Sequence, residues 1–228
     1  MTDIVDTFYV LDLDRCLLDT DKLHAILEQV IARRDPTDGL QLAQAKRDAE
    51  AGGRTFDTYK YVHALVADRP AHEGWLAIER QFLKEAKKQN VLMDHARELL
   101  DILESKHTRY GILTYGIEAW QLVKLEASGL MAIPHEITHI KEKGMVMRGW
   151  VRPDGTFAIP PGMGGLVAQS ITFLDDKAVS FTNLPRGIKG IRIQPVDQPL
   201  LPAQVGALPA SVTEVKGLAG AIELIFGE

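Results

Sequence analysis

The sequence predicts an α/β fold, a doubly wound and mostly parallel sheet, with an all-helical segment inserted into it. Short apolar runs recur along the chain, and amphipathic helical stretches separate several of them. Such runs are typical of strands buried on both faces of a parallel sheet, and their alternation with helices is typical of a doubly wound sheet. One long stretch, residues 21–93, contains helical patterns but no convincing strand.

The individual strands and helices follow from these patterns. Strands are predicted at 8–11, 110–113, 137–140, 171–174 and 190–193. Helices are predicted at 95–106 and 117–128, and the second of these ends at Gly129, a good helix terminator. Residues 145–159 predict a hairpin, because Asp154-Gly155 is a typical turn between two short apolar pairs.

The stretch 21–93 is far longer than an ordinary connection between two core elements. Helices are expected within it at 21–34, 37–51, 56–67 and 70–88. We therefore predict a core domain of residues 1–20 and 94–228, and a helical lobe of residues 21–93 that stands over the strand ends. The alternative is a few extra helices packed on the sheet.

Composition and charge exclude several classes of protein. The 228 residues are 46% hydrophobic and 25% charged, which excludes a disordered chain. With a net charge of −5, neither nucleic acid nor an anionic membrane is an expected partner. The uncharged run 155–174 holds four glycines and two prolines, so it is not expected to span a membrane. A single cysteine, Cys16, and an opening unlike a signal peptide favour a reducing, cytoplasmic location.

Two acidic pairs follow predicted strands: Asp12 with Asp14, and Asp175 with Asp176. In a parallel sheet, both pairs emerge at the edge where ligands gather. Carboxylates about 4 Å apart repel each other by about 4 kcal/mol at an effective dielectric near 20, so the group needs a cation to stay ionised. Oxygen ligands without a dedicated His or Cys favour Mg²⁺ over zinc. Alternatively, each pair caps a following helix or lies in a solvated loop.

Two further polar residues are expected near the same edge. Thr114 follows the strand at 110–113 and brings a hydroxyl to the strand end, although a threonine here also suits a helix cap. Lys143 follows the strand at 137–140, and Lys141 is a competing candidate. A solvated loop is the commoner explanation for a single lysine.

Taken together and in this order, these elements resemble the haloacid dehalogenase-like superfamily, most of whose members are phosphohydrolases. Residues 8–20, FYVLDLDRCLLDT, resemble its first motif, Leu113-Thr114 the second, Lys143 the third, and Leu174-Asp175-Asp176 the fourth. The resemblance implies a Rossmann-like core, with a helical cap where the stretch 21–93 is inserted.

The resemblance also implies two catalytic residues. Asp12 would be a metal ligand and the nucleophile that forms an aspartyl-phosphate. Asp14 would protonate the leaving oxygen and then deprotonate the attacking water, while its backbone carbonyl binds Mg²⁺. Members of the superfamily that cleave carbon–halogen bonds lack an acid at this second position, so Asp14 favours phosphate esters.

The remaining motifs imply the residues that bind phosphate and metal. Thr114 and Lys143 would hold the transferring phosphoryl oxygens, and Lys143 would offset the charge of the nucleophile. Asp176 would bind Mg²⁺ directly, with Asp175 either joining it or holding a metal-bound water. This arrangement is that of in-line phosphoryl transfer, in which positioning and charge neutralisation supply most of the acceleration.

The sequence departs from the family pattern at several positions. The first motif usually continues with Gly-Thr, whereas Arg15 and Cys16 stand here. Arg15 either helps to bind phosphate or faces solvent, and Cys16 is expected to be a small buried hydrophobe rather than a reactive thiol. Ser180, not an acid, stands four residues after Asp176. Arg54, between two expected cap helices, either contacts the substrate or lies in an exposed turn.

We therefore expect a Mg²⁺-dependent phosphatase that acts on a small phosphorylated metabolite, with a cap that closes over the substrate. One alternative is a degenerate member of the superfamily that only binds a phosphorylated ligand or partner. The other is a receiver-like signalling module, which the long helical insertion and the position of the acidic pairs disfavour. The sequence predicts neither a particular metabolite nor an oligomeric state.

Overall fold

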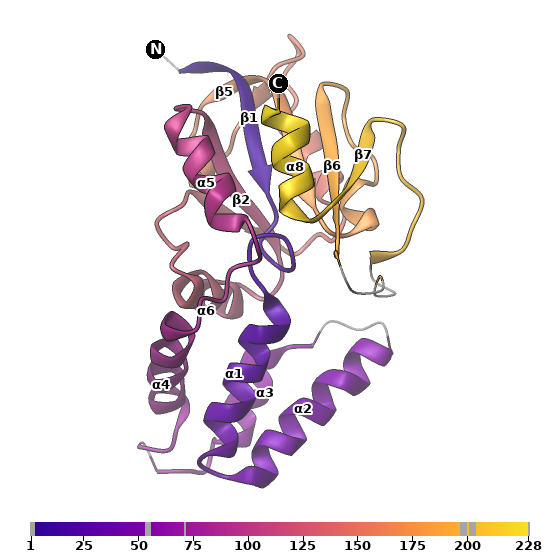
Figure 1. Ribbon diagram of the computed structural model, residues 1–228. Coiled ribbons are helices and arrows are strands. Elements are labelled where there is room, and N and C mark those ends of the chain that lie inside the picture. The colour runs from indigo at the N-terminus through magenta and orange to yellow at the C-terminus, as the bar shows by residue number, and fades with distance from the viewer. Residues whose placement is uncertain (1–2, 53–55, 71, 197–199, 201–203, 228) are drawn as a thin grey trace. The chain divides into compact units, whose positions relative to one another are not determined.

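The computed structural model describes residues 3–52, 56–70, 72–196, 200 and 204–227 (Figure 1). Their contacts divide the chain into two units. The α/β unit comprises the described residues of Met1–Leu18, Leu92–Tyr115 and Ile133–Glu228, and the helical unit those of Asp19–Val91 and Gly116–Ala132.

A mostly parallel sheet forms the centre of the α/β unit. Its described strands are β1 (Ile4–Leu11), β2 (Arg109–Tyr115), β3 (His135–Thr138), β4 (Phe157–Ala158), β5 (Val167–Asp175), β6 (Ile188–Gln194) and β7 (Val212–Lys216). Six of these seven strands lie in the order β3-β2-β1-β5-β6-β7, and every neighbouring pair in that order is parallel. β4 pairs with β5 in the antiparallel direction. The predicted fold class is confirmed, and each of the five predicted strands overlaps an observed one.

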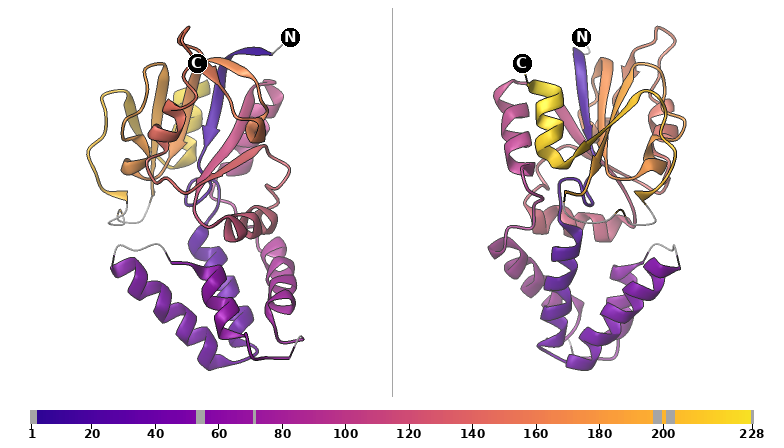
Figure 2. Two further views of the ribbon diagram at one scale, coloured as in Figure 1. Left: turned by 180° about the vertical axis from the view of Figure 1, so that it is seen from behind. Right: turned by 45° about the vertical axis from the view of Figure 1, so that its right-hand side comes forward.

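Helices cover both faces of this sheet (Figures 1 and 2). On one face lie α5 (Ala96–Ser105) and α8 (Gly217–Phe226), which contact each other. On the other lie α7 (Lys143–Arg148) and the short 3₁₀ helices η1 (Pro161–Met163) and η2 (Ala178–Phe181). The sheet is therefore buried on both sides, which is why its strands are short continuous apolar runs rather than alternating ones.

The α7 face of the sheet contains a hydrophobic core of the α/β unit. Phe8 and Val10 of β1 and Phe173 of β5 are fully buried there, together with Phe181 of η2 and Met147 of α7. The rings of Phe173 and Phe181 are 5.0 Å apart. Each such side chain contributes about 1.5–3 kcal/mol on burial, so this core holds α7 and the end of β5 together.

The predicted hairpin at 145–159 is only half right. The turn forms, with Arg152 N–H donating to Thr156 O at 2.8 Å and Gly155 at φ 84°. The predicted first arm at Val146-Met147 is the helix α7, and a shorter antiparallel pairing forms after it: Val151 bridges to Phe157, and Ala158 N–H donates to Trp150 O at 2.7 Å. The second arm also pairs with β5 through β4. In the helix α7, Lys143 and Met147, four residues apart, lie on one face, and both are buried.

The helical unit is built from α1 (Thr20–Ala32), α2 (Pro36–Ala51), α3 (Thr58–Leu65), α4 (Trp75–Lys88) and α6 (Glu118–Ser128). α1 and α3 begin at side-chain caps: Asp19 accepts from Lys22 N–H at 2.9 Å, and Asp57 from Lys60 N–H at 3.0 Å. No helix within the described ranges is both long and apolar enough to cross a membrane.

The helix α6 follows β2 in the chain yet groups with the helical unit. Its Trp120 is buried, stacks on Phe82 of α4 with the ring centroids 6.0 Å apart, and lies 5.6 Å from the ring of His24 of α1. These aromatic contacts pack the face of α6 that carries Trp120 into the hydrophobic core of the helical unit. The prediction assigned 94–228 to the core domain, whereas Gly116–Ala132 groups here with the helices.

Gly144 allows the first turn of α7 to approach the backbone that follows η2. A Cβ at this position would meet the carbonyl oxygen of Thr182 and lie 3.0 Å from the amide nitrogen of Leu184. We predict that Gly144→Ala lowers the free energy of unfolding by about 1–3 kcal/mol, because backbone must shift to admit the methyl group.

Urea denaturation followed by circular dichroism measures this change. The matched control is Gly149→Ala at the exposed end of the same helix, where the added Cβ would meet only Val146 O at 3.2 Å. Equal stability of the two variants would contradict the role assigned to Gly144.

Candidate active site

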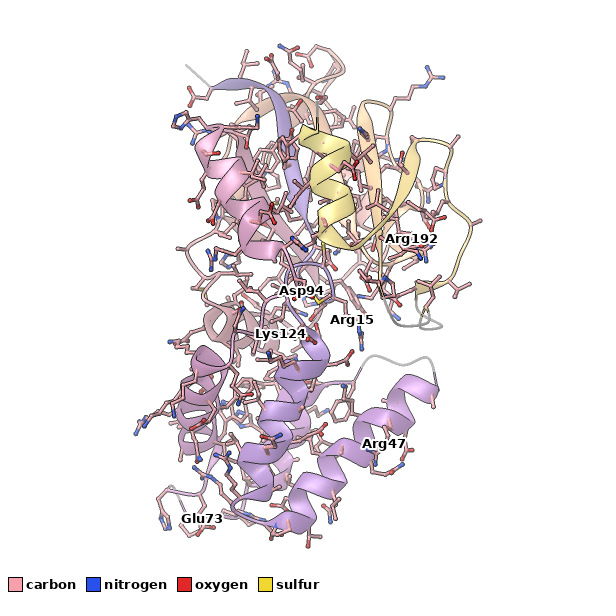
Figure 3. All side chains as sticks on the ribbon, in the orientation of Figure 1. Arg15, Arg47, Glu73, Asp94, Lys124 and Arg192 are labelled. Atoms are coloured by element: carbon pink, nitrogen blue, oxygen red, sulfur yellow. The ribbon has the colours of Figure 1, made fainter. Side chains whose placement is uncertain are left out.

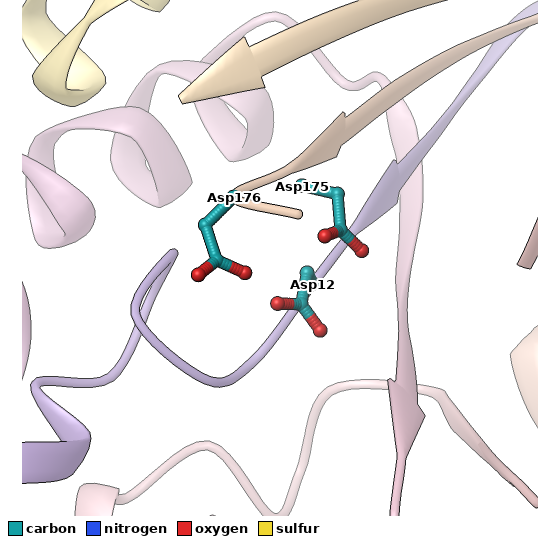
Figure 4. A group of neighbouring side chains, drawn as sticks. All are labelled: Asp12, Asp175 and Asp176. Atoms are coloured by element: carbon teal, nitrogen blue, oxygen red, sulfur yellow. The ribbon is translucent and has the colours of Figure 1, made fainter. Parts of the chain in front are cut away.

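Three buried carboxylates converge where β1 and β5 end (Figure 4). Leu11 and Leu174 are register partners, and Asp12 N–H donates to Leu174 O at 2.9 Å, so the residues that follow them lie side by side. One oxygen from each of Asp12, Asp175 and Asp176 lies within 4.8 Å of the others, and all three residues are at most 1% exposed. We call these three residues the acidic cluster.

Lys143 joins two members of this cluster from the start of α7. Its Nζ donates to Asp12 Oδ1 and, at 2.6 Å, to Asp175 Oδ2, and the residue is 1% exposed. Lys141, the competing candidate, is exposed, and its Nζ lies 5.8 Å from the centroid of the Tyr115 ring. The structure therefore places Lys143, and not Lys141, in contact with the carboxylates.

Two residues that the sequence analysis did not single out contact Asp176. The Nζ of Lys177 lies 3.5 Å from Asp176 Oδ1, and Gln204 Nε2 donates to Asp176 Oδ2 at 2.8 Å. Lys177 also donates its backbone N–H to Asp175 Oδ1 at 2.8 Å. The position of Lys177 directly after two acids could have indicated this contact from the sequence. No neighbouring residue indicates the contact of Gln204, which is 28 residues from Asp176.

The electrostatic balance of the cluster is uneven, because three carboxylates face two ammonium groups. Burial, followed by the charge of Asp175, raises the pKa of Asp12 to about 7, despite the opposing effects of Lys143 and Lys177. Burial also raises the pKa of Asp176. For Lys143, burial lowers the pKa, but Asp12 and Asp175 outweigh it and the net shift is upward. The pKa of Lys177 is raised as well, since Asp176 and the other acids overcome its burial.

Two oxygens of the cluster fit a bound cation. Asp12 Oδ2 and Asp176 Oδ1 are buried and accept no hydrogen bond from any residue in the described ranges, although Lys177 Nζ lies 3.5 Å from Asp176 Oδ1. A buried acceptor without a partner costs about 1–3 kcal/mol, and more when it is charged. Because the available donors are carboxylate oxygens, the residues present suit Mg²⁺ better than zinc.

Asp14 and Arg15 lie in the turn that follows β1, outside the acidic cluster. Asp14 is 9% exposed and bridges to Leu18, whose carbonyl accepts from Arg15 N–H at 2.8 Å. Arg15, labelled in Figure 3, has φ 58°, a left-handed conformation that favours glycine. This backbone geometry gives a physical reason for the glycine that the resembling family usually has here.

The other candidate residues occupy different surroundings. Thr114 is fully buried in β2, the strand that pairs with β1 on the side away from β5, and it is not a member of the acidic cluster. Cys16 is fully buried, and burial, followed by the charge of Asp12, raises the pKa of its thiol. Arg54 lies outside the described residues. The roles predicted for Thr114, Asp14, Arg15 and Arg54 stay predictions.

The raised pKa of Asp12 predicts how stability depends on pH. A carboxyl whose pKa is higher in the folded state stabilises that state while protonated, and the contribution disappears as the pH rises through the folded value. For Asp12 the pKa rises from 3.8 to about 7, so in EDTA the free energy of unfolding should fall across this interval. Asp12→Asn should flatten the decline, as urea denaturation at several pH values would show.

The control for this experiment is Asp6→Asn, which changes an exposed acid on the same strand. Its pH profile should run parallel to that of the wild type. If the Asp12→Asn profile kept the wild-type slope as well, the interpretation of the buried carboxyl would be wrong.

Comparison with known proteins supports the fold rather than a close relationship. No protein-family model matches the chain, and no curated protein matches it. A structure from Burkholderia xenovorans LB400, described as a haloacid dehalogenase-like hydrolase, is similar at a TM-score of 0.65 and 18% identity, over 97% of each chain.

Two other solved structures are similar over nearly their whole length. A protein from Bacillus subtilis described as a HAD-hydrolase, solved with bound magnesium, has a TM-score of 0.52 and 15% identity over 98% of this chain and all of its own. A dehalogenase solved with an intermediate complex has a TM-score of 0.50 and 14% identity over 98% of each chain. The chain has the fold of the haloacid dehalogenase-like hydrolases.

Proposed function

We propose that this protein is a Mg²⁺-dependent phosphohydrolase that acts on a small phosphorylated metabolite through an aspartyl-phosphate on Asp12. The observation that carries the proposal is the environment of the Asp12 carboxylate. It is buried at the end of β1, Lys143 binds one of its oxygens, and the other oxygen accepts no hydrogen bond from the described residues. A buried carboxylate that is held in one orientation suits a nucleophile.

The first step transfers the phosphoryl group to the protein. A carboxylate oxygen of Asp12 forms a bond to phosphorus, the bond between phosphorus and the ester oxygen breaks, and Asp14 donates a proton to that oxygen. In the second step, Asp14 takes a proton from water while the water oxygen attacks phosphorus. The acyl–phosphate bond then breaks, which releases inorganic phosphate and restores the Asp12 carboxylate.

The other residues of the site have separate roles in binding the metal ion and the phosphoryl group. Asp12, Asp176 and the backbone carbonyl of Asp14 would hold Mg²⁺, which supplies positive charge that stabilises the transferring phosphoryl group. Both oxygens of Asp175 already accept hydrogen bonds, from Lys143 Nζ and Lys177 N–H, so this residue would position Lys143. Lys143 and Thr114 would bind the phosphoryl oxygens, and the Lys143 ammonium lowers the repulsion between Asp12 and an incoming phosphate.

Phosphate esters are favoured over carbon–halogen substrates, although one protein of similar fold is a dehalogenase. The reason is Asp14, because the superfamily members that cleave carbon–halogen bonds lack an acid at this position. Magnesium is supported by the oxygen-only cluster and by the magnesium bound to the protein of similar fold from Bacillus subtilis.

We further propose that the helical unit acts as a cap that selects a small metabolite and excludes bulk water. Its main segment is inserted between β1 and β2, where the resembling family has its cap. The net charge of −5 and the single cysteine favour a cytoplasmic enzyme rather than one that acts on nucleic acid or membranes.

Turnover of p-nitrophenyl phosphate tests the proposed reaction. The wild type should release p-nitrophenol with Mg²⁺ and become inactive in EDTA. Asp12→Asn should lower kcat by at least about 10³-fold, because the nucleophile is lost while its shape is kept. Asp6→Asn should keep wild-type activity. Comparable rates for Asp12→Asn and the wild type would eliminate the covalent mechanism.

The leaving group separates the role of Asp14 from that of Asp12. An alkoxide needs a proton when it leaves, whereas p-nitrophenolate does not. Asp14→Asn should therefore lower kcat/KM for an alkyl phosphate such as glycerol phosphate by about 10²–10⁴-fold, and for p-nitrophenyl phosphate by much less. Equal losses with both substrates would show that Asp14 is not the general acid.

A further inference from the structure

A continuous line of polar contacts leads from the edge of the sheet to the acidic cluster. Arg192 of β6 donates from Nη1 to Glu214 Oε2 of β7 at 2.9 Å and from Nη2 to the backbone oxygen of Gln204 at 2.6 Å. The side chain of Gln204 then donates to Asp176 Oδ2 at 2.8 Å. We call Arg192 and Gln204 the support pair; Figure 3 labels Arg192.

Both members of the support pair are buried polar residues, each 3% exposed. A buried guanidinium or amide is costly unless its hydrogen bonds are made, so such groups are kept where their contacts are needed. Arg192 is the register partner of Asp175 on β5 and of Glu214 on β7. It therefore lies at the same level of the sheet as the acidic cluster, one strand away, and fixes the backbone that carries Gln204.

The chemistry of an amide suits this contact. Only the NH₂ group of Gln204 donates to a carboxylate, so the contact orients Asp176 without adding a positive charge. It occupies Oδ2 and leaves Oδ1, which accepts no hydrogen bond from the described residues and lies 3.5 Å from Lys177 Nζ. A lysine or arginine in place of Gln204 would neutralise Asp176, and an acid would repel it.

We propose that Gln204 is a positioning residue that presents Asp176 Oδ1 to the catalytic cation, and that Arg192 holds Gln204 in place. The inference rests on the proposed function, because it assigns Gln204 a role in cation affinity. The sequence offers no acid four residues after Asp176, and Gln204 supplies a buried polar partner to this carboxylate from a distant part of the chain.

Gln204→Met tests the proposal, because methionine has a similar length and no donor. The metal-free variant is titrated with Mn²⁺ in a calorimeter. Its dissociation constant for Mn²⁺ should be about 10–100-fold above that of the wild type, as expected when a partner of a metal ligand is removed. At saturating Mg²⁺, kcat for p-nitrophenyl phosphate should stay near the wild-type value. This separation of affinity from turnover distinguishes a positioning role from general damage to the fold.

The matched control is Gln194→Met on β6, whose amide contacts Glu214 at the far end of the same line of contacts but not Asp176. It should bind Mn²⁺ as the wild type does. Gln204→Asn keeps the amide on a shorter side chain and should lose affinity for Mn²⁺ as Gln204→Met does. If the methionine variant does not fold, the asparagine variant provides the test.

Wild-type affinity in a folded Gln204 variant would overturn the inference and leave the proposed function intact. An equal loss of affinity in Gln194→Met would overturn it too, since the effect would then not depend on Asp176. Absence of Mn²⁺ binding in the wild type would overturn both the inference and the metal dependence of the proposed function.

Discussion

The ammonium group of Lys143, held between the carboxylates of Asp12 and Asp175, is the interaction on which the arrangement of the site depends. Two acids on adjacent parallel strands would repel each other in a buried space, and this cation removes most of that repulsion. The geometry requires three separate features: the register of β1 with β5, the start of α7 at the strand edge, and a glycine after the lysine that allows close backbone contact.

The hydrogen bonds to the three acids differ. Asp175 has both oxygens engaged and serves the internal structure of the cluster. Asp12 and Asp176 each keep one buried oxygen that accepts no hydrogen bond from the described residues. Three buried carboxylates against two ammonium groups form a place that a divalent cation would stabilise. The pKa of Asp12 and that of Asp176 are both raised, mainly because burial disfavours their charged forms.

The parts of this structure that could be predicted are those encoded by adjacent residues. The strand at Phe8 and the acids after it form one short pattern, so the edge position of Asp12 could be read directly. The helix that begins at Lys143 could not, because Val146 and Met147 also suit a strand and only burial in the tertiary core decides between the two. The residues next to Gln204 in the sequence do not indicate a role for it. Its contacts are with Arg192 and Asp176, which are 12 and 28 residues away in the sequence.

The burial of Cys16 has a practical consequence. Its thiol is enclosed in the turn beside Asp12, and its raised pKa keeps it protonated near neutral pH, so alkylating agents and peroxide should react with it slowly. Because the chain has only one cysteine, the rate at which that thiol becomes labelled reports how often the turn opens. The protein thus carries a native chemical probe of local unfolding at the start of its proposed catalytic loop.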